Sequence, residues 1–236
     1  MAEHAVFYGL GVGPGDPELL TLKALRVLEH VNTVVVPRSG QDKESLALSI
    51  ARRYIRKEAR VVDLLFPMTR DRERLEKSWD EAASRIRGYL DQNESTAFLT
   101  VGDPMLYSTY IYLFKRIKDF GYPVVTVPGI PSICAAAASA GFPLGEGDDR
   151  MALVPWSKEQ ALDPEVLRSF NSLALLKVSS DFDGIVDTLK ETGFLKQSVL
   201  VSRCGHDDEQ IEENLASLKG SPVPYFSLIL ARKEKP

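Results

Sequence analysis

Short, nearly continuous apolar runs alternate with helical patterns through the first half of the chain. The apolar runs cover residues 5–11, 33–37, 60–66, 95–101 and 123–128. Apolar residues recur every three or four positions in residues 20–31, 44–55, 71–90 and 110–120. Unbroken apolar runs are typical of strands buried on both faces, and strands that alternate with helices favour a parallel sheet. The pattern predicts an N-terminal α/β domain with a mostly parallel sheet.

The second half has a different pattern, which predicts a second α/β domain with a mixed sheet. Residues 128–147 are rich in Pro, Gly, Ala and Ser, and we expect one short Ala-rich helix among them. We therefore place the boundary between domains 1–128 and 129–236. Strands are predicted at residues 151–156, 172–178, 198–205 and 225–232, and helices near 163–170 and at 183–193. Asp183 and Gly193 are expected to cap the last helix.

Composition and charge narrow the class of protein. The 236 residues are 44% hydrophobic and 26% charged, as in ordinary globular domains, and the net charge of −4 gives no field that would attract nucleic acid. No stretch approaches the roughly 18 apolar residues of a membrane span. Cys134 and Cys204 stand far apart and outside any CxxC pair, which disfavours disulfides and a zinc site. We expect a cytoplasmic protein with no metal site, no nucleic acid and no membrane partner.

A glycine-rich turn follows the first apolar run. It reads Gly9-Leu-Gly-Val-Gly-Pro-Gly-Asp-Pro17. The dinucleotide fingerprint G-x-G-x-x-G fails here, because Pro14 or Asp16 occupies its last glycine position, depending on the frame. Pro14 also lacks the N–H that a pyrophosphate would bind, so the turn suits a ligand without phosphates and disfavours a dehydrogenase. A tight turn without a ligand is the alternative.

Four later segments stand at the ends of predicted strands. Gly102-Asp103-Pro104 repeats the Gly-Asp-Pro of the first turn, and a residue before proline is held extended, which frees its carboxylate to cap N–H groups. Carboxyl ends of neighbouring parallel strands line one crevice, so a pocket shared with the first turn is expected, helix capping alone being the alternative. The other segments are Gly129 to Ser132, Leu176-Lys177 and Arg203-Cys204-Gly205.

In this order the five segments resemble the tetrapyrrole methylase family, whose members methylate uroporphyrinogen, precorrins and cobalt-factors with S-adenosylmethionine. The resemblance covers essentially the whole chain. Within the family, four segments look like the enzymes that modify carbon 20 of precorrin-2 or cobalt-factor II. These segments are residues 45–54, 66–79, 101–113 and 224–230.

The resemblance implies a two-domain α/β homodimer with S-adenosylmethionine, and its product S-adenosylhomocysteine, in a cleft between the domains. The family's cofactor contacts, mostly through backbone atoms, fall on Pro14, Gly102, Asp103, Met105, Leu106, Pro131, Ser132, Leu176, Lys177 and Cys204. Many relatives have Met where this chain has Leu176. Uroporphyrinogen methylases carry an acidic residue after the second strand where this chain reads Val36-Pro37-Arg38, which disfavours that substrate.

Methyl transfer to a reduced tetrapyrrole chiefly requires alignment, with a base to remove a proton from the ring. Asp103, Lys177 and Tyr225 are the nominated catalytic residues. Arg38, Arg70, Arg72, Lys177 and Arg203 are expected nearest the substrate carboxylates, although such side chains are often only solvated.

Several alternatives stay open. They are methylation at another ring position, RNA or protein methylation as in other family members, and a non-catalytic sensor or scaffold that keeps the cofactor site. An RNA methylase would need a basic surface that the sequence does not indicate. No residue decides between metal-free precorrin-2 and cobalt-factor II.

Overall fold

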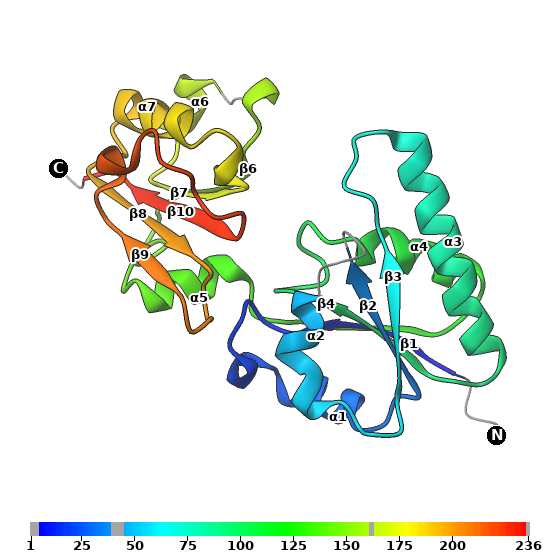
Figure 1. The fold of residues 1–236 in the computed structure, drawn as a ribbon. Coiled ribbons are helices and arrows are strands. Elements are labelled where there is room, and N and C mark those ends of the chain that lie inside the picture. Colours follow the sequence, from blue (N-terminus) through cyan, green and yellow to red (C-terminus); the bar gives the residue numbers. More distant parts are fainter. Residues whose placement is uncertain (1–4, 39–44, 161–162, 235–236) are drawn as a thin grey trace. The chain divides into compact units, whose positions relative to one another are not determined.

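The computed structural model describes residues 5–38, 45–160 and 163–234, and the chain divides into two compact units (Figure 1). The N-terminal unit is Met1–Pro131 and the C-terminal unit is Ser132–Pro236. Among the described residues, no helix has the length and apolar character that crossing a membrane requires.

The N-terminal unit is built around a five-stranded parallel sheet with the order β3-β2-β4-β1-β5. Its elements are β1 (Phe7–Gly11), α1 (Leu22–Leu28), β2 (Thr33–Arg38), α2 (Leu46–Ala51), β3 (Arg60–Leu65), α3 (Arg72–Asp91), β4 (Thr96–Thr100), α4 (Tyr110–Asp119) and β5 (Val124–Val127). The five strands and four helices predicted for the first half are all present. The first residue of the predicted helix 44–55, Glu44, lies outside the described residues.

Helices cover both faces of the central strands of this sheet, which explains the unbroken apolar runs of β1, β2 and β4, whereas alternate residues of the edge strand β3 are exposed. On one face, Phe7 and Phe98 pack against α3 and α4; on the other, Leu10 and Leu99 pack against α1 and α2. Figure 1 shows the two helix pairs on opposite sides of the sheet. In the helices on both faces, the buried side chains have the three- and four-residue spacing of an amphipathic helix.

The C-terminal unit contains a mixed five-stranded sheet with the order β6-β7-β10-β8-β9. Its elements are α5 (Ser132–Ser139), β6 (Met151–Pro155), α6 (Pro164–Arg168), β7 (Ser172–Leu176), α7 (Phe182–Thr192), β8 (Gln197–Ser202), β9 (Gln210–Glu212) and β10 (Ser227–Arg232). The β6–β7 pair is parallel and the other pairs are antiparallel, which confirms the predicted mixed sheet. The small residues of α5 pack on one face, and α6 and α7 cover the other.

Two local expectations for this unit need correction. Asp183 does not cap α7: the N-cap is Asp181, and the Asp183 carboxylate instead accepts a hydrogen bond from the Gly220 amide at 3.0 Å. Gly193 ends the helix as predicted, in the left-handed region with φ of 82°. Strand β9 was not predicted, because its three residues are exposed and are held by pairing with β8.

Candidate functional site

Three loops leave the carboxyl ends of the adjacent strands β4, β1 and β5 in the N-terminal unit. The Gly102 amide donates to the Gly13 carbonyl at 2.7 Å, and these two residues form an isolated antiparallel bridge. Gly13 and Gly102 have φ values of 78° and 73°, which favour glycine. The structure therefore brings the turn after β1 and the Gly-Asp-Pro segment after β4 side by side, as the sequence predicts.

Gly11 and Gly129 extend this contact to the loop after β5. A Cβ atom on Gly11 would lie 2.4 Å from the Gly129 nitrogen and 2.6 Å from the Gly102 oxygen. A Cβ atom on Gly129 would lie 2.2 Å from the Gly102 oxygen. The three backbones touch only because these positions lack side chains. Gly9 serves the core instead, because its missing Cβ leaves room for the buried ring of Tyr110.

The Asp103 carboxylate connects two of the loops. Its Oδ1 accepts from the Met105 amide at 2.8 Å, and its Oδ2 accepts from the Gly129 amide at 3.0 Å. In the first turn, Asp16 accepts from the Glu18 amide at 2.8 Å. The carboxylates of both Gly-Asp-Pro segments therefore cap backbone N–H groups as predicted. The bond from Gly129 to Asp103 also joins residues far apart in sequence, which the capping argument does not reveal.

The predicted cofactor contacts of the N-terminal unit lie on these loops. Pro14 is buried directly after the Gly13 bridge, whereas the Met105 side chain is 52% exposed and Leu106 is half-buried. Pro131 ends this unit two residues after Gly129, and Ser132 begins α5 in the C-terminal unit. The loops thus combine backbone polar groups with apolar side chains, without the phosphate-binding turn of a dinucleotide site.

The other predicted site residues gather at one edge of the C-terminal sheet. Antiparallel pairing sets Leu176 of β7 opposite Leu228 of β10, so Lys177 after β7 and Tyr225 before β10 lie at the same edge. The Arg203 amide, after β8, donates to the Phe226 carbonyl at 2.7 Å at this edge. Lys177 and Arg203 both have left-handed backbone, with φ of 60° and 53°.

A half-buried carboxylate fixes the loop after β8, and sequence reasoning missed it. Glu209 accepts from the Gly205 amide at 2.6 Å and from the Ser139 hydroxyl of α5. Burial, followed by the charge of Glu209, raises the pKa of Cys204 to about 12. Burial by itself would raise the pKa of Glu209, but hydrogen bonds from Ser139, Gly205 and Cys204 lower it. In sequence, Glu209 is one acidic residue in a polar loop, and nothing marks it as an anchor.

Three of the cations expected near the substrate form ion pairs within the protein. Arg38 pairs with Asp63 at 3.4 Å and Arg72 with Glu76 at 3.8 Å. Arg203 pairs with Asp208, which lowers the pKa of the Asp208 carboxyl. These cations are partly neutralised where they stand, whereas no ion pair of Lys177 is observed within the described part of the chain.

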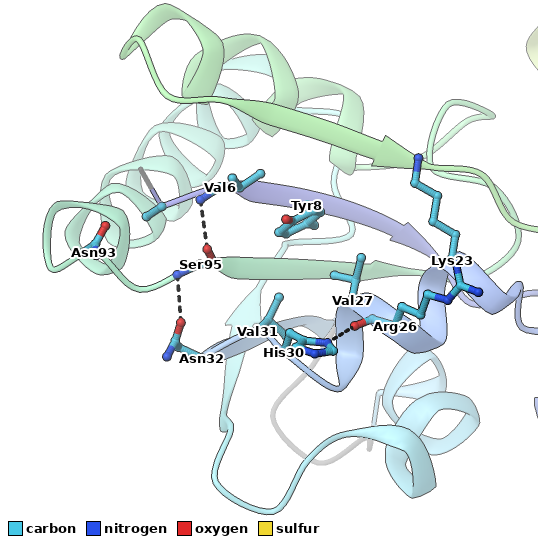
Figure 2. A pocket seen from close by; sticks show the side chains of 11 residues that line it. Val6, Tyr8, Lys23, Arg26, Val27, His30, Val31, Asn32, Asn93 and Ser95 are labelled. Carbon is cyan, nitrogen blue, oxygen red and sulfur yellow. Dashed lines mark hydrogen bonds between the residues drawn. The ribbon is translucent and has the colours of Figure 1, made fainter. Parts of the chain in front are cut away.

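A separate hollow of the N-terminal unit lies along α1, and we call it the α1 groove. It has a volume of about 670 Å³ and is shown in Figure 2. Its lining residues are Ala5, Val6, Tyr8, Lys23, Arg26, Val27, His30, Val31, Asn32, Asn93 and Ser95. None of them belongs to the three loops of the candidate site.

Comparison with known proteins assigns the class of protein that this fold and these loops belong to. The family model for tetrapyrrole (corrin/porphyrin) methylases matches residues 6–219, and the chain belongs to this family. It is 36% identical over 206 residues to the probable cobalt-precorrin-2 C(20)-methyltransferase of Methanocaldococcus jannaschii, covering 83% of this chain and 86% of that relative. It is 34% identical over 230 residues to the cobalt-precorrin-2 C(20)-methyltransferase of Salmonella typhimurium, covering 96% of both chains.

Solved structures agree on the fold. A cobalt precorrin-4 methyltransferase has a TM-score of 0.77 at 22% identity, covering 98% of this chain and 96% of the other. A Thermus thermophilus uroporphyrin-III C-methyltransferase complexed with S-adenosylhomocysteine has a TM-score of 0.66 at 23% identity, covering 96% of this chain and 97% of the other. The predicted family and its α/β fold are therefore confirmed.

Proposed function

We propose that this chain transfers a methyl group from S-adenosylmethionine to carbon 20 of a cyclic tetrapyrrole in cobalamin biosynthesis. The observation that carries the proposal is the similarity, over nearly the whole chain, to relatives named as cobalt-precorrin-2 C(20)-methyltransferases. A relative named precorrin-2 C(20)-methyltransferase, from Sinorhizobium, is 28% identical over 234 residues. Cobalt-factor II and precorrin-2 are both candidate substrates.

The three loops of the N-terminal unit fit this cofactor. A sulfonium cofactor needs polar backbone groups for its amino-acid and ribose parts and an apolar slot for adenine, with no phosphate cradle. Gly102, Asp103 and Pro14 offer closely packed backbone, and Met105 and Leu106 offer apolar surface. Pro131 and Ser132, together with Leu176, Lys177 and Cys204 of the C-terminal unit, are the other proposed contacts.

The residues of the chain chiefly position the reactants. When bound, S-adenosylmethionine supplies an electrophilic methyl group. Asp103 holds the loops after β4 and β5 together through both carboxylate oxygens, which supports a positioning role more than the nominated role as base. Lys177 and Tyr225 stand at one sheet edge, and Tyr225 is 61% exposed, so both can face a ring substrate. We propose one of them as the base.

We also propose that the protein is a cytoplasmic homodimer. The family resemblance supports the dimer, and the cysteine pattern and composition support the compartment. Light scattering on the purified chain tests the assembly: a mass near twice 26.2 kDa is expected, and a monomer at all concentrations contradicts it.

A turnover assay tests the activity. The protein is incubated with S-adenosylmethionine carrying a ¹³C-methyl group and, in separate reactions, with precorrin-2 and cobalt-factor II. We expect one added methyl by mass spectrometry, and NMR should place the label on carbon 20. A label on another ring position refutes the carbon-20 assignment, and no methylated product with either macrocycle supports the sensor or scaffold alternative.

A further inference from the structure

One wall of the α1 groove is a single face of helix α1. Lys23, Arg26 and Val27 of α1 have the spacing i, i+3, i+4, which places their side chains along one stripe, and His30 continues this wall from the turn after the helix. Tyr8 of the adjacent strand β1 lies across from this stripe (Figure 2). The remaining lining residues come from the beginning of β1 and from the segments that precede β2 and β4.

The charge of the groove has one sign. Its 11 lining residues include Lys23 and Arg26 but no Asp or Glu, although the whole chain has a net charge of −4. Both cations are exposed, and within the described ranges neither forms an ion pair. By contrast, the exposed cations Arg72 and Arg87 each pair with a carboxylate on the next turn of their helix. Two unpaired cations at one end of a hollow attract an anion.

The remaining lining supplies neutral donors and apolar surface. Ser95 accepts from the Val6 amide at 3.1 Å through its Oγ, which leaves its hydroxyl proton for another acceptor. Asn32 accepts from the Ser95 amide at 3.1 Å through its side-chain oxygen, which leaves its amide N–H₂ group as a donor. Val27, Val31 and the Tyr8 ring provide an apolar wall.

We propose that the α1 groove is a second binding site, which takes a small organic anion. The apolar body of the ligand lies against Tyr8 and Val27, and its carboxylate, sulfonate or phosphate group is held by Lys23 and Arg26. The volume of about 670 Å³ suits a ligand of this size. A bare inorganic anion would leave the apolar wall unused, and a neutral ligand would leave the cations unused.

Two dyes that share one aromatic body test the proposal. 8-Anilinonaphthalene-1-sulfonate carries the anion, and N-phenyl-1-naphthylamine is the same body without it. Fluorescence titration of the full chain should show the sulfonate dye binding at least tenfold more tightly than the neutral dye. The double variant Lys23→Ala/Arg26→Ala should weaken sulfonate binding roughly tenfold and leave the neutral dye unchanged.

The matched control removes the same charges elsewhere. Arg85→Ala/Lys115→Ala changes one exposed Arg of α3 and one exposed Lys of α4, and neither lines the groove. This control should bind the sulfonate dye within twofold of the parent protein. Equal dye binding by the parent and the α1 variant overturns the proposal. Displacement of the dye by S-adenosylhomocysteine also overturns it, because the dye would then occupy the cofactor site.

Discussion

Replacing Gly11 by Ala tests the close approach of the three loops. The new Cβ would lie 2.4 and 2.5 Å from the Gly129 nitrogen and Cα, and 2.6 Å from the Gly102 oxygen. These are backbone atoms, so no side chain can rotate away. Ordinary contact requires a shift of about 1 Å, which would stretch the 3.0 Å bond from the Gly129 amide to Asp103 beyond hydrogen-bonding distance.

The expected cost has two parts. Overpacking costs about 1–3 kcal/mol, and losing a hydrogen bond to a charged acceptor costs about 1.5–3 kcal/mol. We expect Gly11→Ala to lower the free energy of unfolding by about 3–5 kcal/mol in urea titrations followed by circular dichroism. S-adenosylhomocysteine affinity, measured by calorimetry, should fall at least tenfold, because the loops that hold it are pushed apart.

Gly88→Ala is the matched control. Gly88 lies inside α3, and an added Cβ there meets no atom within 4 Å. The same chemical change should raise the free energy of unfolding by about 0.5–1 kcal/mol, because Ala favours a helix more than Gly does. If the free energy of unfolding of Gly11→Ala lies within about 0.5 kcal/mol of the parent protein's and its S-adenosylhomocysteine affinity is unchanged, the three loops do not depend on the close approach of Gly11 to Gly129 and Gly102.

Three further predictions concern single side chains. Asp103→Asn keeps one acceptor oxygen but turns an N–H₂ group toward the other backbone amide. The free energy of unfolding in urea should therefore fall by about 1–2 kcal/mol. An unchanged free energy of unfolding would show that stability does not depend on either hydrogen bond. With the pKa of Cys204 raised to about 12 from an ordinary value near 9, the neutral thiol stabilises the fold below pH 9 and this stability is lost as the pH rises toward 12. In a Cys134→Ser variant we therefore expect the free energy of unfolding to fall by about 1 kcal/mol by pH 10, and a further Cys204→Ser change should remove this fall. Equal pH profiles of stability for the two variants would contradict the raised pKa of Cys204. If Lys177 is the base, Lys177→Met should lower kcat about a hundredfold, and if Tyr225 is the base, Tyr225→Phe should lower kcat by a similar factor. A normal kcat in both variants excludes both residues as the base.

The sequence predicts the elements of this protein well because local patterns determine them. Five apolar runs become β1 to β5, and the two Gly-Asp-Pro segments place their carboxylates on nearby amides as expected. These features depend on the periodicity of apolar residues and on the restricted backbone conformation before proline, which are both determined by residues close together in sequence.

The features that the sequence does not reveal depend on residues far apart in the chain. Asp183 is expected to cap α7, but Asp181 is the N-cap and accepts from the Trp156 indole, and Asp183 accepts from the Gly220 amide. Strand β9 exists only through its pairing with β8. Glu209 looks like a solvated acid until Ser139 and Gly205 are brought to it.

A crystal structure of the chain with S-adenosylhomocysteine tests the central claim most directly. Our account predicts that the ligand contacts the backbone of Pro14, Gly102 and Asp103, with Met105 and Leu106 against its apolar part. A ligand bound elsewhere, with the loops after β1, β4 and β5 untouched, would contradict it.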